Sequence, residues 1–193
     1  MKKAIALLFI MAGFIIIGFA GYEIYQTQAK EKEALEMARE LVFSKEQSDR
    51  SFEDTLEDFD PGDGDVIGIL HIPRLDADLP IVQGTHEDDL ARGVGHYTGT
   101  AYPTDGRQIL LSGHRDTVFR NLGKLELGDT FEIHMNYGTF VYEIMETDIV
   151  DADDRTVIDY SIDEELLTVS TCYPFNFVGS APDRYILHAK PVE

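Results

Sequence analysis

One cysteine, six histidines and several arginines are the groups in this chain best suited to chemistry. Cys172, His114 and Arg184 each lie at the end of a predicted β-strand, where a rigid scaffold presents side chains at an exposed rim. A cysteine nucleophile needs a proton acceptor and a group that stabilises an oxyanion. These three residues could supply such a set, and they are our candidates for catalysis.

Residue types and positions alone leave plainer interpretations open. Cys172 could be a small buried hydrophobic residue, and Arg184 a solvated or salt-bridged surface residue. The other histidines lie in predicted strands (His71, His134 and His188), in a polar loop (His86), or in a loop after a glycine (His96). His96 is therefore the rival base to His114, with a supporting or structural role as its expected function.

Short apolar runs separated by turn residues position these groups. They predict strands at 66–72, 79–82, 108–112, 130–135, 140–145, 166–171 and 185–189. Pro80 places the second of these near a sheet edge. About eight strands with few helices predict an all-β fold, an antiparallel-rich closed barrel with short helices, because closure removes exposed strand edges.

A different element begins the chain. Residues 4–22 are uncharged and mostly apolar, long enough as a helix to cross a bilayer. Lys2 and Lys3 precede them, which predicts a single span with a cytoplasmic N-terminus and the rest of the chain outside the cell. A cleaved signal peptide is the competing interpretation.

Composition divides the rest of the chain. Residues 23–65 are predicted to form an acidic helical stalk and linker, helical up to Phe43, and residues 66–193 the working domain. The chain has 36 acidic and 16 basic side chains, a formal net charge of -20, which excludes a nucleic-acid partner. A single cysteine excludes an internal disulfide and a Cys-rich zinc site.

Several segments of the sequence resemble those of a known family. Thr168-Val169-Ser170-Thr171-Cys172 resembles the sortase signature T-L-x-T-C, with Val169 in place of leucine. Gly113-His114 is similar to the histidine strand of sortases, and Asp183-Arg184-Tyr185 to their arginine strand. The stretches 90–97 and 111–119 are similar to class D sortases in particular.

The resemblance covers residues 66–190 and implies an eight-stranded sortase barrel with cysteine transpeptidase activity at a Gram-positive cell surface. Such enzymes cut surface proteins at an LPxTG-like C-terminal signal after threonine, then join the threonyl carboxyl to an amine of the peptidoglycan precursor or cell wall. The implied roles are nucleophile for Cys172, acid and base for His114, and oxyanion or substrate binding for Arg184.

Further expectations concern supporting residues and metal binding. Thr171 is predicted to pack or hydrogen-bond beside the nucleophile, and Asp183 to orient Arg184. No cofactor or metal is expected, although acidic side chains that could suit Ca²⁺ crowd the segment before the cysteine strand: Asp148, Asp151, Asp153, Asp154, Asp163, Glu164 and Glu165.

The sequence favours one subclass and leaves two other functions open. The chain ends soon after its last strand, and Asp60-Pro61 is followed by Gly62, so the lid motif of pilin-polymerising sortases is not reproduced. This favours anchoring of single proteins. A hydrolytic cysteine peptidase using the same residues, and a non-catalytic membrane-tethered binding domain, remain the alternatives.

Overall fold

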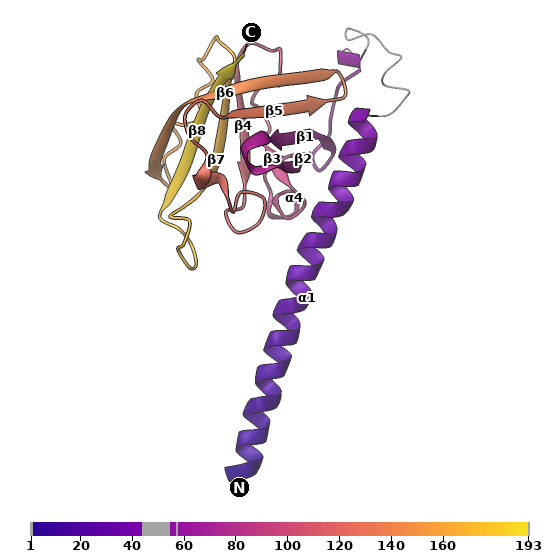
Figure 1. The fold of residues 1–193 in the computed structure, drawn as a ribbon, viewed down its shortest axis with the longest axis vertical. Helices are drawn as coiled ribbons and strands as arrows, with labels where there is room; N and C mark the ends of the chain where they lie inside the picture. Colours follow the sequence, from indigo (N-terminus) through magenta and orange to yellow (C-terminus); the bar gives the residue numbers. More distant parts are fainter. Residues whose placement is uncertain (1, 44–54, 57, 193) are drawn as a thin grey trace.

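The computed structural model describes residues 2–43, 55–56 and 58–192 (Figure 1). Part of the predicted linker, residues 44–54 and 57, lies outside the described residues. The chain begins with a long helix and continues into strands joined by short helices. The elements are α1 (Lys2–Phe43), β1 (Val66–Ile72), η1 (Pro73–Leu75), β2 (Ala77–Gln83), α4 (Glu87–Leu90), β3 (Val94–His96), β4 (Gln108–Gly113), η2 (Leu122–Lys124), β5 (Thr130–Met135), β6 (Gly138–Asp151), β7 (Leu166–Tyr173) and β8 (Asp183–Pro191).

The strands close into a barrel in the order β1-β2-β3-β4-β7-β8-β6-β5. The pairs β2–β3 and β4–β7 are parallel, and the other neighbours are antiparallel. The predicted all-β closed barrel is thereby confirmed. Its interior is filled by side chains that alternate with outward-facing ones, as in β5, where every second residue is buried.

One strand was not predicted from the sequence, and the position of a sheet edge was predicted wrongly. β3 has only three residues, Val94 to His96, too few for an alternating pattern to show. Pro80 lies in a strand that has neighbours on both sides, so the predicted edge strand is wrong. Pairing with β3 begins at Ile81, one residue after Pro80, so the residue without an N–H donor lies where the parallel ladder has not yet started.

α1 is one continuous helix through the predicted anchor and the predicted stalk. It is long and apolar enough in its first half to cross a membrane, and the apolar side chains there, such as Phe9, Phe14 and Ile17, are exposed. Figure 1 shows α1 as a rod that extends well beyond the barrel. A continuous apolar surface of this kind is typical of a segment that contacts lipid or another protein.

The second half of α1 packs against the barrel instead of standing clear of it. Ala34 and Ala38, four residues apart on one helix face, are fully buried. Their small side chains let the helix approach closely. Arg39 Nη2 lies 2.8 Å from Asp78 Oδ2, and this guanidinium, with help from His71, lowers the pKa of the Asp78 carboxyl.

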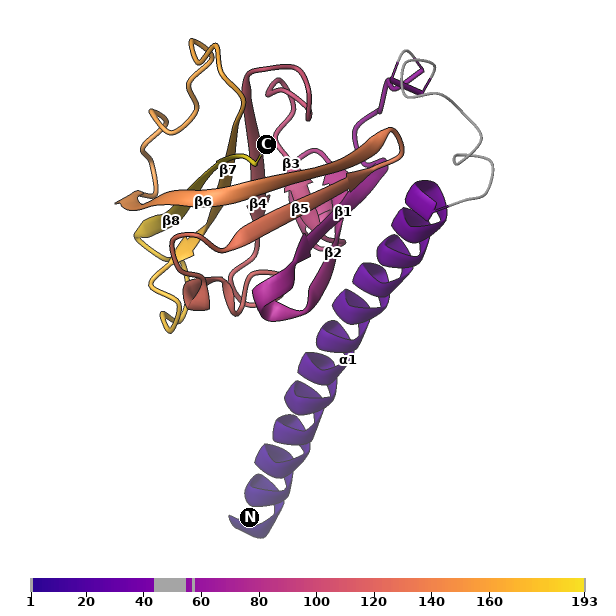
Figure 2. The ribbon, with the colours of Figure 1, turned by 45° about the horizontal axis from the view of Figure 1, so that its top comes forward.

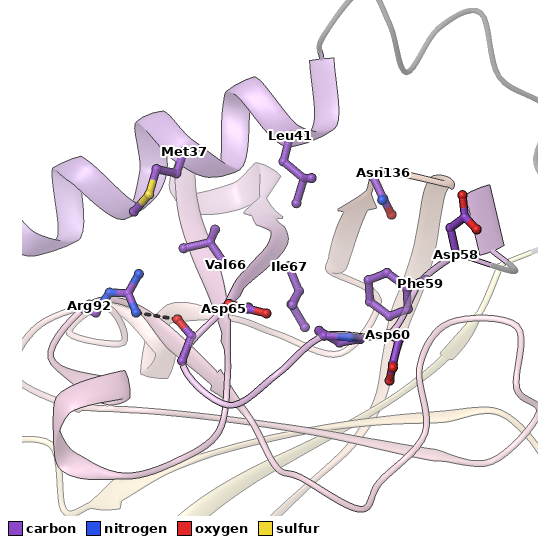
Figure 3. A pocket seen from close by; sticks show the side chains of 12 residues that line it. Met37, Leu41, Asp58, Phe59, Asp60, Asp65, Val66, Ile67, Arg92 and Asn136 are labelled. Carbon is purple, nitrogen blue, oxygen red and sulfur yellow. Dashed lines mark hydrogen bonds between the residues drawn. The ribbon is translucent and has the colours of Figure 1, made fainter. Parts of the chain in front are cut away.

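A cavity of about 420 Å³ remains beyond these contacts, at the C-terminal end of α1 (Figure 3). Met37 and Leu41 of the helix face Phe59, Ile67 and other side chains across it, and Asn136 of the β5–β6 turn lies at its rim. None of the three candidate catalytic residues lines it.

The fit of α1 to the barrel is testable through its alanines. Ala38→Leu should lower the stability of the full-length protein in detergent by about 1–3 kcal/mol, because an enlarged side chain cannot fit the buried contact without displacing the helix. Ala29→Leu is the matched control, since Ala29 is exposed on the same helix. Thermal unfolding measures both, and equal melting temperatures would contradict the packing described.

Candidate active site

The three candidate catalytic residues lie on adjacent strands, β4, β7 and β8. Cys172 of β7 pairs directly with Arg184 of β8. On the other side of β7, the last pair of the β4–β7 ladder is Gly113 with Thr171, and His114 follows Gly113 as Cys172 follows Thr171. Residues in register on neighbouring strands share a face of the sheet. The structure thus brings together the three residues that the sequence singled out.

This shared face is the outer one. Val169 and Leu187, which pair with each other, belong to the buried core. Cys172 is three positions from Val169 and therefore has the opposite orientation along the strand. Cys172, His114 and Arg184 are all half-buried, which leaves them accessible to a substrate on the outside of the barrel.

Thr171 points the other way and ties two of these strands together. Its side chain is buried, and its Oγ1 donates a hydrogen bond of 2.7 Å to the carbonyl oxygen of Gly113. This bond joins the residue before the nucleophile to the residue before His114. The contact ties β7 to β4 next to Cys172, and the supporting role expected for Thr171 in catalysis stays a prediction.

The backbone at His114 is held by the turn that follows it. The carbonyl of His114 accepts hydrogen bonds from the N–H groups of Thr117 and Phe119. The buried ring of Phe119 folds back over Gly113, and a Cβ at Gly113 would lie 2.5 Å from that ring. Glycine is therefore required before His114 because the ring occupies the space of a side chain.

Arg115, the residue directly after His114, connects the two loops of the site. It is only 6% exposed, and its Nη1 donates a hydrogen bond of 2.8 Å to the carbonyl oxygen of Pro174. Its remaining donors contact the Asp116 carboxylate. Arg115 follows His114, and Pro174 lies two residues after Cys172. This contact therefore connects the loop that carries His114 to the segment that follows Cys172. The sequence carries no signal for this contact beyond the position of Arg115 directly after His114.

The guanidinium of Arg184 forms no ion pair with a carboxylate in the described part of the chain. Its Nη1 donates to the carbonyl oxygens of Asp183, at 3.0 Å, and of Ala181, at 3.4 Å. Asp183 therefore contacts Arg184 through its backbone carbonyl. No ion pair between the Asp183 carboxylate and Arg184 occurs among the described residues, and the orienting role of Asp183 stays a prediction.

His96 lies at the end of β3, not in a loop as expected. It is buried and pairs with Leu111, whose side chain faces the core. Its ring nitrogens lie 2.9 Å from Gln83 Oε1 and from the Ala101 carbonyl oxygen, and its ring stacks on Tyr102. Burial lowers the pKa of His96, an effect that the bond to Ala101 opposes. Its position is inside the barrel, away from the outer face of Cys172.

The acidic side chains before the cysteine strand have separate partners. Glu164 pairs with Lys190, Glu165 accepts a bond from Tyr142, and Asp154 caps the backbone of Thr156. Among the described residues no three or more His, Cys, Asp or Glu side chains are grouped so that they could hold a metal ion. Calcium independence stays a prediction, tested by activity with and without a chelator.

Comparison with known proteins agrees with this geometry. A family model, Sortase domain, matches residues 70–192. Sortase D of Bacillus subtilis is 45% identical over 198 residues, covering 100% of both chains. A structure of a Clostridium perfringens Sortase D5 transpeptidase has a TM-score of 0.71 and 31% identity, covering 86% of this chain and 99% of that one. Sortase C1 of Streptococcus suis gives a TM-score of 0.62 at 26% identity, covering 74% and 78% of the two chains.

The contact between Arg115 and Pro174 predicts a positioning role. Arg115→Ala should lower kcat by about 10- to 100-fold, because small displacements of reacting groups cost that much, while KM changes little. Arg107→Ala, an exposed arginine before β4, is the control. Far-ultraviolet circular dichroism and melting temperature check folding. A fall in melting temperature with unchanged kcat would show that Arg115 stabilises the fold only.

The buried His96 predicts a pH-dependent stability. Since its pKa is lower in the folded than in the unfolded chain, unfolding takes up a proton as pH falls. The stabilisation is complete above about pH 6.5, the ordinary value for histidine, and is lost as pH falls below it. Urea unfolding between pH 8 and pH 5 should show a shallower loss for His96→Gln, which keeps a hydrogen-bonding side chain.

His134 provides the comparison for this experiment. Partial burial lowers the pKa of His134 and the neighbouring His71 lowers it further, whereas the carboxylates of Glu132 and Asp78 oppose the shift. His134→Gln should therefore change the pH dependence less than His96→Gln. Identical pH dependence in the wild type and the His96 variant would contradict the interpretation.

Proposed function

This chain belongs to the sortase family of cysteine transpeptidases, and we propose that it cleaves an LPxTG-like sorting signal after threonine and transfers the protein to a cell-wall amine. The observation that supports this most directly is the register of β4, β7 and β8. Cys172 pairs with Arg184, and the residues before Cys172 and His114, Thr171 and Gly113, pair with each other, which supports a shared site. The remaining steps follow from the chemistry of these side chains.

Cys172 is the nucleophile of the first step. Its thiolate attacks the threonyl carbonyl carbon, and the carbonyl electrons move to oxygen to form a tetrahedral oxyanion. Collapse of this oxyanion breaks the bond to the leaving amine and forms a thioester. His114 gives the leaving nitrogen its proton, because an amide nitrogen is a poor leaving group unless it is protonated.

Arg184 stabilises the charge that develops in this step. Its guanidinium is bound only by backbone carbonyls among the described residues, so its charge is not neutralised by a carboxylate. A fixed guanidinium adjoining the nucleophile in register can donate to the oxyanion or to the substrate backbone.

The second step reverses the first with another amine. The incoming amine of the cell-wall precursor attacks the thioester carbonyl, His114 takes its proton, and the thiolate of Cys172 leaves. The product is an amide between threonine and the acceptor, and the enzyme returns to its starting state. Water in place of the amine would give hydrolysis by the same residues.

The location of this chemistry is part of the proposal. Residues 4–22 of α1 anchor the enzyme in the cell membrane as a single span, with Lys3 on the cytoplasmic side and the barrel outside a Gram-positive cell. The apolar, exposed first half of α1 supports this arrangement.

Substitution of the three residues tests the assignment. With an LPxTG-like peptide and triglycine, Cys172→Ala should abolish product formation. His114→Ala should lower kcat by about 10²- to 10⁴-fold through loss of proton transfer. Arg184→Lys should lower kcat/KM by about 10²- to 10³-fold, because lysine keeps the charge but not the guanidinium geometry.

Mass spectrometry of the products separates the competing functions. A peptide joined to triglycine indicates transpeptidation, whereas only the free threonyl acid indicates a hydrolase. His96→Ala is the matched histidine control. Loss of turnover in His96→Ala with turnover retained in His114→Ala would show that the base is misassigned.

A further inference from the structure

Contacts along α1 establish which end of the barrel lies nearest the membrane. Leu41 lies at the cavity that Asn136 borders, and Arg39 pairs with Asp78 further towards the N-terminus of the helix. Further still along the helix, the turns 23–31 and the loop segment 116–120 enclose a cavity of about 440 Å³. The loop that follows His114 thus lies beside the part of α1 that directly follows the apolar stretch.

The barrel therefore has a defined polarity relative to α1. Glu23, at the edge of the apolar stretch, is about 27 Å along the helix axis from Leu41. Figures 1 and 2 both show the loop between β7 and β8 extending towards the side of the molecule on which the N-terminus lies, and Figure 1 shows the C-terminus at the opposite end of the barrel. The catalytic end of β4, β7 and β8 is the end that faces the apolar half of α1.

The base of the β7–β8 loop is held firmly. The Phe175 ring packs against Gly123 of η2, where a Cβ would lie 2.5 Å from the ring. The same ring contacts Tyr173 and Tyr185, with centroid separations of 5.6 and 5.3 Å. With Arg115 bound to Pro174, this loop and the loop after His114 form one unit.

The tip of the same loop is apolar and exposed. Val178 is 95% exposed, more than any other large hydrophobic side chain in the described ranges, and Phe177 is 43% exposed. Arg120 and Lys124, on the neighbouring loop, are exposed as well. The same neighbouring segment also carries the exposed carboxylates of Asp116 and Glu126, so it is the exposed apolar side chains of the tip, and not its charge, that indicate contact with lipid.

We propose that Phe177 and Val178 insert into the outer surface of the membrane that holds α1, so that the active site opens at the level of the lipid headgroups. The choice of a lipid surface rests on continuity: the tip lies on the side of the barrel from which the membrane-spanning half of α1 extends. This proposal rests on the membrane anchor in the proposed function, and it does not depend on the chemistry of Cys172.

Site-specific labelling of the full-length protein tests this placement. In a Cys172→Ala background, Val178→Cys, Tyr160→Cys and Phe14→Cys each supply a single thiol for an environment-sensitive fluorophore. Tyr160 is the matched control because it is 67% exposed and lies in the loop before β7, at the opposite end of the strand. Phe14 reports whether α1 itself is inserted.

The labelled proteins are reconstituted in phosphatidylcholine–phosphatidylglycerol vesicles that contain a lipid carrying a nitroxide quencher. We expect several-fold stronger quenching at positions 14 and 178 than at position 160. Quenching at position 14 with equal, weak signals at 178 and 160 would overturn the proposal and leave the anchor intact. Absence of quenching at position 14 would overturn both.

A protein occupant of the tip is distinguished in the same samples. Shielding of position 178 that persists in detergent and grows with protein concentration would show a second copy as the partner, and would overturn the lipid assignment. Transpeptidation of soluble peptides by the Cys172 enzyme is measured separately. Its failure would contradict the proposed function without changing the result at position 178.

Discussion

Register between three strands is the constraint on which this site depends. Because side chains alternate between the two faces of a strand, a slip of one residue in β7 would turn Cys172 into the core and move Val169 to the surface. Core packing by Val169 and Leu187 makes such a slip unfavourable, and the hydrogen bond from Thr171 to Gly113 adds a specific contact at the β4–β7 seam. The hydrophobic interior therefore determines which groups face the substrate.

The loops that follow β4 and β7 hold His114 and Cys172 in place beyond the strands. His114 lies just beyond β4, where no ladder hydrogen bond continues, and the turn closed over it by Phe119 takes the place of a neighbouring strand. Arg115 then joins this turn to the segment after Cys172. A buried guanidinium that bonds both a carbonyl and a carboxylate has little freedom, which suits a group that must hold two loops at a constant separation.

The sequence alone predicts much of this arrangement. Strands rich in β-branched residues and bounded by turns reveal seven of the strands, and the ends of those strands reveal His114, Cys172 and Arg184. β3 could not be predicted because its three residues are too few to show an alternating pattern. The buried position of His96 at the end of β3 could therefore not be predicted either. The packing of α1 also escapes, since the spacing of Ala34 and Ala38 suits any helix and does not identify its partner. Arg115 could not be placed because its partner is a backbone carbonyl distant in sequence.

The unbroken course of α1 has a consequence for how the enzyme meets its substrates. In the proposed membrane-anchored state, a helix that runs from the apolar stretch into contact with the barrel would leave the barrel little freedom to rise or fall above the lipid. An enzyme and a substrate that are both tethered to one membrane search for each other in a thin layer instead of a volume, which raises their effective concentration. On this proposal the geometry would also discriminate by tether length, because a cleavage site would be reached only when the chain between it and its own membrane attachment matches the height of Cys172.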